Sequence, residues 1–556
     1  MTPATSFDRA VALRRLAEEP FDVLVVGGGI TGAGVALDAA SRGLRTALVE
    51  RHDFASGTSS KSSKLVHGGL RYLQQRDFRL VYEALAERQR LRHTAPHLVH
   101  LLPFLIPLFG KGGAINPKLA RAVNWALWMY DLTGGARIGR LHQRVDADEA
   151  LAHMPTLDPT KVVGGFVYWD AQTDDARLTL TVARTAADHG AAAANHCEVV
   201  AVLKGGDGRV QGATVRAGND TFDVRARVVV NAGGVWADQV RALDEGGDPG
   251  TLRPAKGVHV AVPWDRLRND IAAVVPVPRD RRSVFVVPQG DRTYIGTTDT
   301  DYDGPLDDPR CTADDIGYLL GAVNSWVTEP LTPDDVVGSW AGLRPLVRDA
   351  TSERTADLSR RHAVLTSPSG VVTVTGGKLT TYRRMAADTV DTAVRVLGGG
   401  GRSRTRRLRL RGADGVEALA GDTAAARMGI AADVLEHLVG RHGTDARTVA
   451  AMVSADPGLG ERLVPSLPHL RAEAVYAARY EMAVTLDDVL SRRIPARWLA
   501  AEASVAAAPD VARLVGTELG WDATTADREA ARYAGAVRAE RDAAGLSAGA
   551  AAGGSA

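Results

Sequence analysis

The residues whose spacing most clearly indicates chemistry are three glycines, Gly27-x-Gly29-x-x-Gly32, and a later carboxylate, Glu50. In this spacing the first glycine allows a tight turn, the second lets the backbone approach a pyrophosphate, and the third lets a helix pack on a strand. The free N–H groups at the start of that helix bind an anion. An acid about 20 residues further on binds the ribose hydroxyls. Glu50 therefore predicts an unphosphorylated ribose, as in FAD or NAD.

The elements that must position these residues appear in order around them. An apolar run over residues 22–26 predicts a strand buried on both faces of a parallel sheet. A helix is expected over residues 33–42, ending at Gly43, and a second strand over 46–49. A glycine turn without a ligand is the alternative, but the complete βαβ order favours dinucleotide binding.

A polar loop with many hydroxyl side chains follows Glu50 and reaches Lys64. Its hydroxyls and amides are placed to contact the phosphates and ring of a dinucleotide. His67, Gly68, Gly69 and Arg71 follow in one short segment. Paired glycines beside a cofactor loop indicate close approach of the backbone to a flat ring.

The composition limits the other function classes. At 556 residues the chain predicts two or three domains. Lys+Arg at 67 against Asp+Glu at 66 gives no reason to expect nucleic acid. Cys197 and Cys311 lie far apart without a CxxC motif, so neither a metal site nor a disulfide is indicated. Because no signal peptide opens the chain, we expect it on the cytoplasmic side.

Two apolar stretches, residues 98–109 and 125–130, have two interpretations. The first is too short to span a bilayer and contains two prolines. Both stretches could be buried core. Both could instead form a monotopic membrane face, with Trp and Tyr at the level of the lipid headgroups.

The rest of the chain predicts three further parts. Alternating strands over 258–262, 283–287 and 294–296 indicate an antiparallel layer that carries the substrate pocket. Four glycines at 398–401 mark a domain boundary before a basic run at 402–411. We predict a discontinuous nucleotide-binding and substrate domain over 1–397, a linker over 398–415, a helical domain over 416–540 and a disordered tail over 541–556.

Several motifs together carry a resemblance to a known family. They are GGGITGAG (27–34), TSSKSSKLVHGGLRYL (58–73), NAGGVW (231–236), KGVHV (256–260), IGTTD (295–299), GLRPL (342–346) and GGKLTTYR (376–383). The chain resembles FAD-dependent glycerol-3-phosphate dehydrogenases of the D-amino-acid-oxidase-like flavoprotein superfamily. The resemblance implies an α/β FAD-binding Rossmann-like domain with an embedded antiparallel-sheet substrate domain and a C-terminal α-helical domain.

The resemblance also implies a reaction. sn-Glycerol 3-phosphate loses hydride from C2 to FAD and a proton from its C2 hydroxyl, giving dihydroxyacetone phosphate, and the electrons pass to a membrane quinone. His259 is the expected general base, since imidazole titrates near neutral pH. His67 competes for that role, although its place beside Gly68 and Gly69 fits flavin contact better. Arg344 and Lys378 complete the expected catalytic set.

The expected substrate contacts are those that bind a phosphate dianion. They are Arg71, Tyr72, His259, Arg344, Lys378 and Thr380.

The expected FAD contacts come from the glycine loop (residues 27–32), the polar loop over residues 51–64, here called the hydroxyl loop, and two later strand ends. They are Gly27, Gly29, Gly32, Glu50, Thr58, Ser59, Ser62, Ser63, Lys64, His67, Gly69, Ala232, Gly233, Gly377, Lys378, Leu379 and Thr380.

Other functions of the same fold stay open at this point. A glycerol-3-phosphate oxidase would pass electrons to oxygen, and an amine or amino-acid oxidase would bind a carboxylate on its arginines. A non-catalytic scaffold would use the βαβ unit only to stabilise a fold. We expect a peripheral attachment to the cytoplasmic membrane face, and a homodimer is one candidate oligomeric state.

Overall fold

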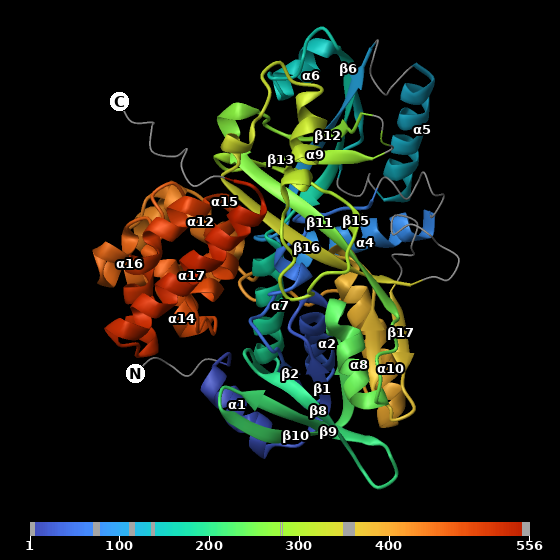
Figure 1. Cartoon of the computed structure of the whole chain (residues 1–556), viewed down its shortest axis with the longest axis vertical. Helices are drawn as coiled ribbons and strands as arrows, with labels where there is room; N and C mark the ends of the chain where they lie inside the picture. Colours follow the sequence, from blue (N-terminus) through green and yellow to red (C-terminus); the bar gives the residue numbers. More distant parts are fainter. Residues whose placement is uncertain are drawn as a thin grey trace.

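The computed structural model describes residues 6–69, 78–110, 117–134, 139–278, 280, 282–348 and 362–546. It contains two β-sheets, with helices on their faces, and a C-terminal group of helices that packs against one side (Figure 1). The predicted fold class is confirmed.

The first sheet is the nucleotide-binding one. Its path runs β17-β18-β10-β1-β2-β7, and the neighbours from β18 to β7 pair in parallel. Its strands are β1 (Phe21–Val26), β2 (Thr46–Val49), β7 (Ala192–Ala194), β8 (Glu198–Lys204), β9 (Val210–Ala217), β10 (Asp220–Asn231), β17 (Ala363–Thr366) and β18 (Val372–Thr375). The order reverses at β1, because β2 and β10 lie on opposite sides of it. Ligands bind at such a switch point, outside the carboxyl ends of the strands.

The predicted βαβ unit is present, with one difference at the start of its helix. α2 (Ile30–Ser41) begins directly after the second glycine, with Gly29 as its N-cap. Gly32 therefore lies inside the first turn and faces β1, since a Cβ there would meet the oxygen of Gly27 at 1.8 Å. Gly43 has a φ of 90° just past the helix end, a conformation that favours glycine.

The second sheet carries the predicted antiparallel layer. Its path runs β15-β11-β14-β13-β12-β4-β6-β3, with β16 on β11 and β5 on β6. The strands are β3 (Leu65–Val66), β4 (His100–Phe109), β5 (Gln143–Val145), β6 (Val162–Gln172), β11 (Leu252–Pro263), β12 (Ala272–Pro276), β13 (Ser283–Gln289), β14 (Arg292–Gly296), β15 (Thr300–Asp301) and β16 (Gly338–Val347). β11, β13, β14 and β16 pair antiparallel and support the site.

The two apolar stretches have different outcomes. Residues 98–109 form β4, which is paired with β6 and buried over most of its length, so the membrane interpretation is wrong for them. Residues 125–130 lie in α5 (Pro117–Thr133), where Leu127 and Tyr130 are buried but Trp125 and Trp128 are 58% and 46% exposed.

The helix α4 (Phe78–Thr94) carries charged side chains that are buried in its middle turns. Arg88 is 0% exposed because its guanidinium is paired with Asp170 of β6. Glu87 is also buried, paired with Arg383 at the start of α10 (Tyr382–Leu397).

The remaining helices flank the sheets or form the C-terminal part. The flanking ones are α1 (Arg9–Glu18), α6 (Ala147–His153), α7 (Asp175–Asp188), α8 (Ala237–Glu245) and α9 (Ala313–Asn324). The C-terminal ones are α11 (Asp422–Met428), α12 (Ala432–His442), α13 (Ala446–Ala455), α14 (Arg471–Tyr480), the π-helical turn η11 (Asp488–Arg493), α15 (Ala496–Leu499), α16 (Ala501–Leu519) and α17 (Ala523–Ala543). Buried apolar side chains run without interruption from β4 and β6 to α14, η11, α15, α16 and α17, so this part of the C-terminal group shares a core with the second sheet.

The segment between α10 and the C-terminal helices lies against the nucleotide-binding part. Leu410 is 3% exposed, and Thr405 and Ser403 donate to the Asp38 carboxylate of α2. Arg411 pairs with Asp188 and Asp445. In the described part of the chain, the helices are too short or too polar to cross a bilayer.

Candidate active site

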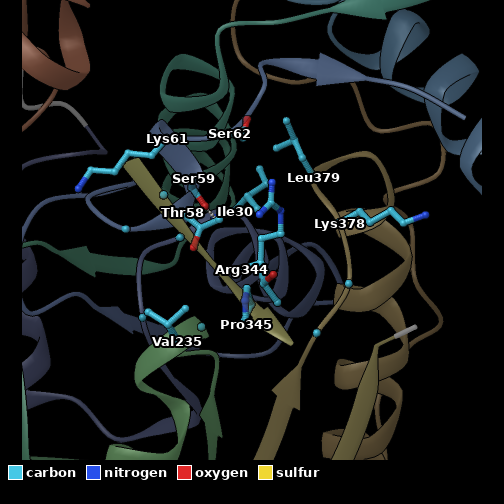
Figure 2. Close-up of a pocket in the computed structure, with 18 of the residues that line it drawn as sticks. Ile30, Thr58, Ser59, Lys61, Ser62, Val235, Arg344, Pro345, Lys378 and Leu379 are labelled. Atoms are coloured by element: carbon cyan, nitrogen blue, oxygen red, sulfur yellow. Dashed lines mark hydrogen bonds between the residues drawn. The ribbon is translucent and has the colours of Figure 1, made fainter. Parts of the chain in front are cut away.

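A cavity of about 780 Å³ lies between the carboxyl end of β1 and the antiparallel strands β11 and β16 (Figure 2). Its walls come from the glycine loop, the hydroxyl loop, the β10–α8 turn, the second sheet and the β18–α10 turn. The predicted residues that line it are Gly27, Gly29, Glu50, Thr58, Ser59, Ser62, Ser63, His67, Gly69, Ala232, Gly233, His259, Arg344, Gly377, Lys378, Leu379 and Thr380. A cavity of this size holds a cofactor-sized ligand.

The glycine loop has the shape that a pyrophosphate requires. Gly27 has a φ of 109°, and a Cβ there would meet the backbone oxygen of Ala232 at 2.6 Å. The N–H of Ile30, in the first turn of α2, donates to the Ser59 hydroxyl at 2.9 Å. The N-terminus of α2 therefore faces the cavity beside a hydroxyl side chain and favours an anion there.

Glu50 directly follows β2 and lines the cavity. One carboxylate oxygen accepts from the N–H of Gly28 at 2.6 Å and the other from the N–H of His52 at 2.9 Å. Burial raises the pKa of Glu50, and these two N–H donors oppose the rise. A carboxylate has about four acceptor positions, so ribose hydroxyls can still bind it.

Asp175, the first residue of α7, holds the end of the hydroxyl loop in place. Ser62 donates to Asp175 through its N–H at 2.9 Å and its hydroxyl at 2.7 Å, and the Lys64 ammonium lies 2.5 Å from the other oxygen. Lys64 is thus buried on a carboxylate and does not line the cavity. Gly32 does not line it either, since it packs against β1.

The segment His67-Gly68-Gly69 is held from both sides. The N–H of His67 donates to the Thr380 hydroxyl at 3.1 Å, which ties it to the β18–α10 turn. The N–H of Gly68 donates to the Tyr130 hydroxyl at 3.0 Å and to Asp170 at 3.2 Å. A Cβ on Gly68 would meet Tyr130 and Leu85 below 3 Å, so α4 and α5 pack directly under this turn.

His259 lies in β11 and is 2% exposed. Its ring stacks on Trp340 at 4.9 Å, and its Nε2 is 2.9 Å from the Ser63 hydroxyl. Burial, followed by the charges of Arg344 and Lys64, lowers the pKa of His259 well below 6.5. Its Nδ1 is a buried nitrogen without a hydrogen-bond partner among the residues that the structure describes. The imidazole is therefore neutral at neutral pH.

Arg344 lies in β16, across from the same strand. Its guanidinium donates to the Asp299 carboxylate at 3.2 Å, the Thr297 hydroxyl at 3.2 Å and the Thr298 carbonyl at 3.1 Å. A Cβ on Gly257 would come within 2.5 Å of Nη2, so this glycine makes room for the arginine. The guanidinium is held in one orientation at the cavity wall.

Lys378 and Lys61 enter from opposite sides of Arg344, and their side chains extend away from it (Figure 2). Arg71 and Tyr72, which we predicted as substrate contacts, lie outside the described residues.

Several lining residues were missed from the sequence. Asp299 orients Arg344, and Arg282 donates to the Asp299 carbonyl at 2.8 Å. Trp236, with the Arg51 guanidinium over its ring at 4.8 Å, forms the wall near Glu50. The IGTTD and NAGGVW motifs contain Asp299 and Trp236, so these two had a signal. Arg282 had none, because it is one of three arginines in the run RDRR (279–282), and such a charged run before a strand is common on surfaces.

Comparisons with known proteins agree with this geometry. A family model described as FAD dependent oxidoreductase matches residues 22–383, and one described as the C-terminal domain of alpha-glycerophosphate oxidase matches residues 403–526. The chain belongs to the FAD dependent oxidoreductase family.

Named relatives extend over most of this flavoprotein. It is 45% identical to glycerol-3-phosphate dehydrogenase 2 of Mycobacterium tuberculosis (strain ATCC 25618 / H37Rv), over 96% of this chain and 90% of the relative. It is 40% identical to the mitochondrial glycerol-3-phosphate dehydrogenase of Mus musculus, over 92% and 72%. A solved glycerol-3-phosphate dehydrogenase from Bacillus halodurans complexed with FAD matches with a TM-score of 0.78 and 30% identity, over 97% and 98%.

Because the chain belongs to this family, its cofactor is FAD. The residues at the cavity fit that group, because the start of a helix, an acid at the end of the second strand, a neutral histidine and an arginine line one cavity.

Proposed function

We propose that this flavoprotein oxidises sn-glycerol 3-phosphate to dihydroxyacetone phosphate. The observation that carries the proposal is that His259 and Arg344 line the same cavity as the glycine loop and Glu50. The names of the relatives, at 40–45% identity over most of the chain, support the same substrate. When bound, FAD supplies the acceptor for the hydride from C2.

His259 removes the proton of the C2 hydroxyl. Its Nε2 faces the Ser63 hydroxyl at the cavity wall, where a substrate hydroxyl can take the same hydrogen bond. The lowered pKa keeps the imidazole unprotonated, as a base must be. A bound phosphate dianion would offset the charge of Arg344. Because that charge lowers the pKa of His259, the imidazole becomes more basic only when substrate is present.

Arg344 binds the phosphate group. Asp299 and the Thr297–Thr298 segment hold its guanidinium in place, so little conformational entropy is lost on binding. We retain Lys378, Thr380, Arg71 and Tyr72 as further substrate contacts and keep His67 as a flavin contact. The other predicted residues around the glycine and hydroxyl loops are proposed to bind FAD.

We further propose that electrons leave to a membrane quinone and that the chain binds the cytoplasmic membrane face through α4 and α5. Figure 1 shows this helix pair on the side of the molecule away from the C-terminal helices. Tyr82, Trp125, Trp128 and Leu132 are 51%, 58%, 46% and 75% exposed there, and Arg121 of α5 is also exposed. Aromatic side chains with a neighbouring cation suit a lipid headgroup region.

The test is an anaerobic absorbance spectrum before and after addition of sn-glycerol 3-phosphate. Bleaching of the bound flavin band is expected. Reoxidation by a soluble quinone analogue, much faster than by oxygen, would support the acceptor. A spectrum that stays yellow with glycerol 3-phosphate but bleaches with an amino acid would reject the substrate.

A further inference from the structure

One charged contact between the C-terminal helices and the FAD-binding part centres on Asp53, which is 0% exposed. Arg493 donates to both of its oxygens, at 2.6 and 2.8 Å, and Arg492 donates to one at 2.6 Å. Asn195 donates to it at 2.9 Å. Both arginines belong to the π-helical turn η11, about 440 positions further along the chain.

Asp53 begins a turn that touches the glycine loop. The N–H of Ser56 donates to the Asp53 carbonyl at 3.0 Å, and the N–H of Ala55 donates to the Gly28 carbonyl at 3.1 Å. Phe54 fills the space that a Cβ on Gly28 would need. Movement of this turn therefore moves the backbone that binds the pyrophosphate.

The turn contains a conformation that its surroundings must hold. Ala55 has a φ of 65° and is 1% exposed. A residue with a Cβ is less stable than glycine in this left-handed region, and it persists where neighbouring contacts fix it. The ion pairs of Asp53 are the contacts that fix this turn from the C-terminal side.

The arginines are themselves held rigidly. Arg493 also donates to the Glu481 carbonyl at 2.7 Å, and Arg492 donates to Asp488 at 2.7 Å. Asp53, His196 and Asp488 come within 4.8 Å of one another, but the two arginines already balance the carboxylate charges. The cluster is thus an ion-pair joint between two parts of the chain.

A second contact lies beside the residues that fix the hydroxyl loop. Arg441 of α12 donates to Asp174 at 3.1 Å, next to the Asp175 that fixes Ser62 and Lys64. The same C-terminal helices therefore brace both the glycine loop and the hydroxyl loop.

We propose that the C-terminal helical domain is a clamp that retains FAD, and that Arg493 is its main positioning residue, acting through Asp53 and the Ala55–Gly28 hydrogen bond. The inference rests on FAD as the cofactor and is independent of the substrate. FAD binding can be measured even if glycerol 3-phosphate fails to reduce the flavin.

The test uses Arg493→Lys in the full chain, which keeps the charge but loses the two-pronged contact. FAD is removed, and its binding to the apoprotein is titrated by flavin fluorescence. The dissociation constant is expected to rise about ten-fold or more, with an unchanged far-UV circular dichroism spectrum. Turnover at saturating FAD should stay near that of the parent protein.

Arg479→Lys is the matched control, since Arg479 pairs with Glu518 inside the C-terminal domain, at 41% side-chain exposure. It should leave FAD affinity unchanged. If both variants have the parent's dissociation constant, the clamp is overturned and the contact is only structural. Should Arg493→Lys not fold, Asn195→Ala decides: a rise of about three-fold or more supports the clamp, and an unchanged constant overturns it.

Discussion

His259 is the residue on which the proposed chemistry depends, and its environment makes a specific prediction. His259→Ala should keep its bound yellow flavin, because the imidazole is buried against Trp340 and Ser63. Flavin reduction by substrate should fall about 10²–10⁴-fold, the range for loss of a general base. Single-turnover stopped-flow absorbance measures this.

His153→Ala is the control for that experiment, since His153 is a partly exposed histidine paired with Asp270 at the surface. It should reduce its flavin at the parent rate. Full-rate reduction in His259→Ala would reject His259 as the base and return the role to His67.

Arg344 gives a second residue-scale prediction, about pH. Because its positive charge is one cause of the lowered pKa of His259, Arg344→Gln should raise that pKa. The acid limb of the reduction rate lies below pH 6.5 in the parent protein and should move to higher pH in the variant.

Arg344→Lys keeps the charge, so it should leave the acid limb of the pH profile in place. It should raise KM about ten-fold or more, since an ammonium lacks the bidentate fork of the guanidinium. If the acid limb stays at the parent's pH in Arg344→Gln, the charge of Arg344 does not set the pKa of the base.

At the scale of elements, the paired strands β11 and β16 place the Arg344 guanidinium directly against Gly257. Gly257→Ala should displace the guanidinium, because the new Cβ would lie 2.5 Å from Nη2. KM for glycerol 3-phosphate should rise several-fold to ten-fold, with a smaller change in FAD affinity. Gly206→Ala is the control, since its Cβ would meet open space. Equal KM values for the two variants would contradict the placement of Arg344 at the substrate.

The helix α5 carries the next prediction. Replacing Trp125 and Trp128 together by Ser should weaken binding to anionic phospholipid vesicles by roughly 10- to 100-fold. Full burial of a large apolar side chain contributes about 1.5–3 kcal/mol, and each of these half-exposed tryptophans has about half of its surface left to bury. Trp264→Ser, at a tryptophan that is 37% exposed in the turn directly after β11, serves as the control. Co-sedimentation measures the binding. If the α5 variant sediments with vesicles as the parent protein does, the proposal that this face binds the membrane is rejected.

The sequence predicted those elements whose signal is local. The βαβ unit, the antiparallel strands and the α10 turn each have a periodicity or a glycine pattern of their own, and all are present. β4 was ambiguous, because two prolines argue against a central strand. The structure accommodates them since β12 pairs with β4 only at Phe104 and Leu105, between the prolines. The domain boundaries near residues 397, 415 and 540 stay predictions.

Contacts between distant segments could not be predicted in this way. Asp53 and Arg493 are about 440 positions apart, and neither has a local pattern that names its partner. The same holds for Arg282 and for Arg88, whose burial depends on Asp170 of a strand that periodicity alone does not pair with α4. Only the folded chain brings these charges together.

At the scale of the whole molecule, buried histidines make the joint between the C-terminal helices and the sheets sensitive to acid. Burial, with smaller contributions from His100 and His442, lowers the pKa of His97 to about 4. Burial also lowers the pKa values of His442 and His469. These groups are neutral when folded and become protonated when unfolded, so the unfolded chain binds more protons below pH 6.5. Stability should therefore fall as the pH decreases from about 6.5 to 4.

For His97 alone the loss amounts to about 2 kcal/mol by pH 5, from its shift of pKa from 6.5 to about 4. His97→Gln removes that proton uptake, so its melting temperature should change less between pH 7 and pH 5 than that of the parent protein. His153→Gln, at the surface, should follow the parent. Melting curves by circular dichroism at the two pH values measure this. Equal acid sensitivity in all three proteins would show that carboxylates such as Glu473 and Glu481, whose pKa values are lowered below 4.5, control the acid limit instead. In that case stability should hold down to about pH 4.5 and fall only below it, because those groups lose their ion pairs when they become protonated.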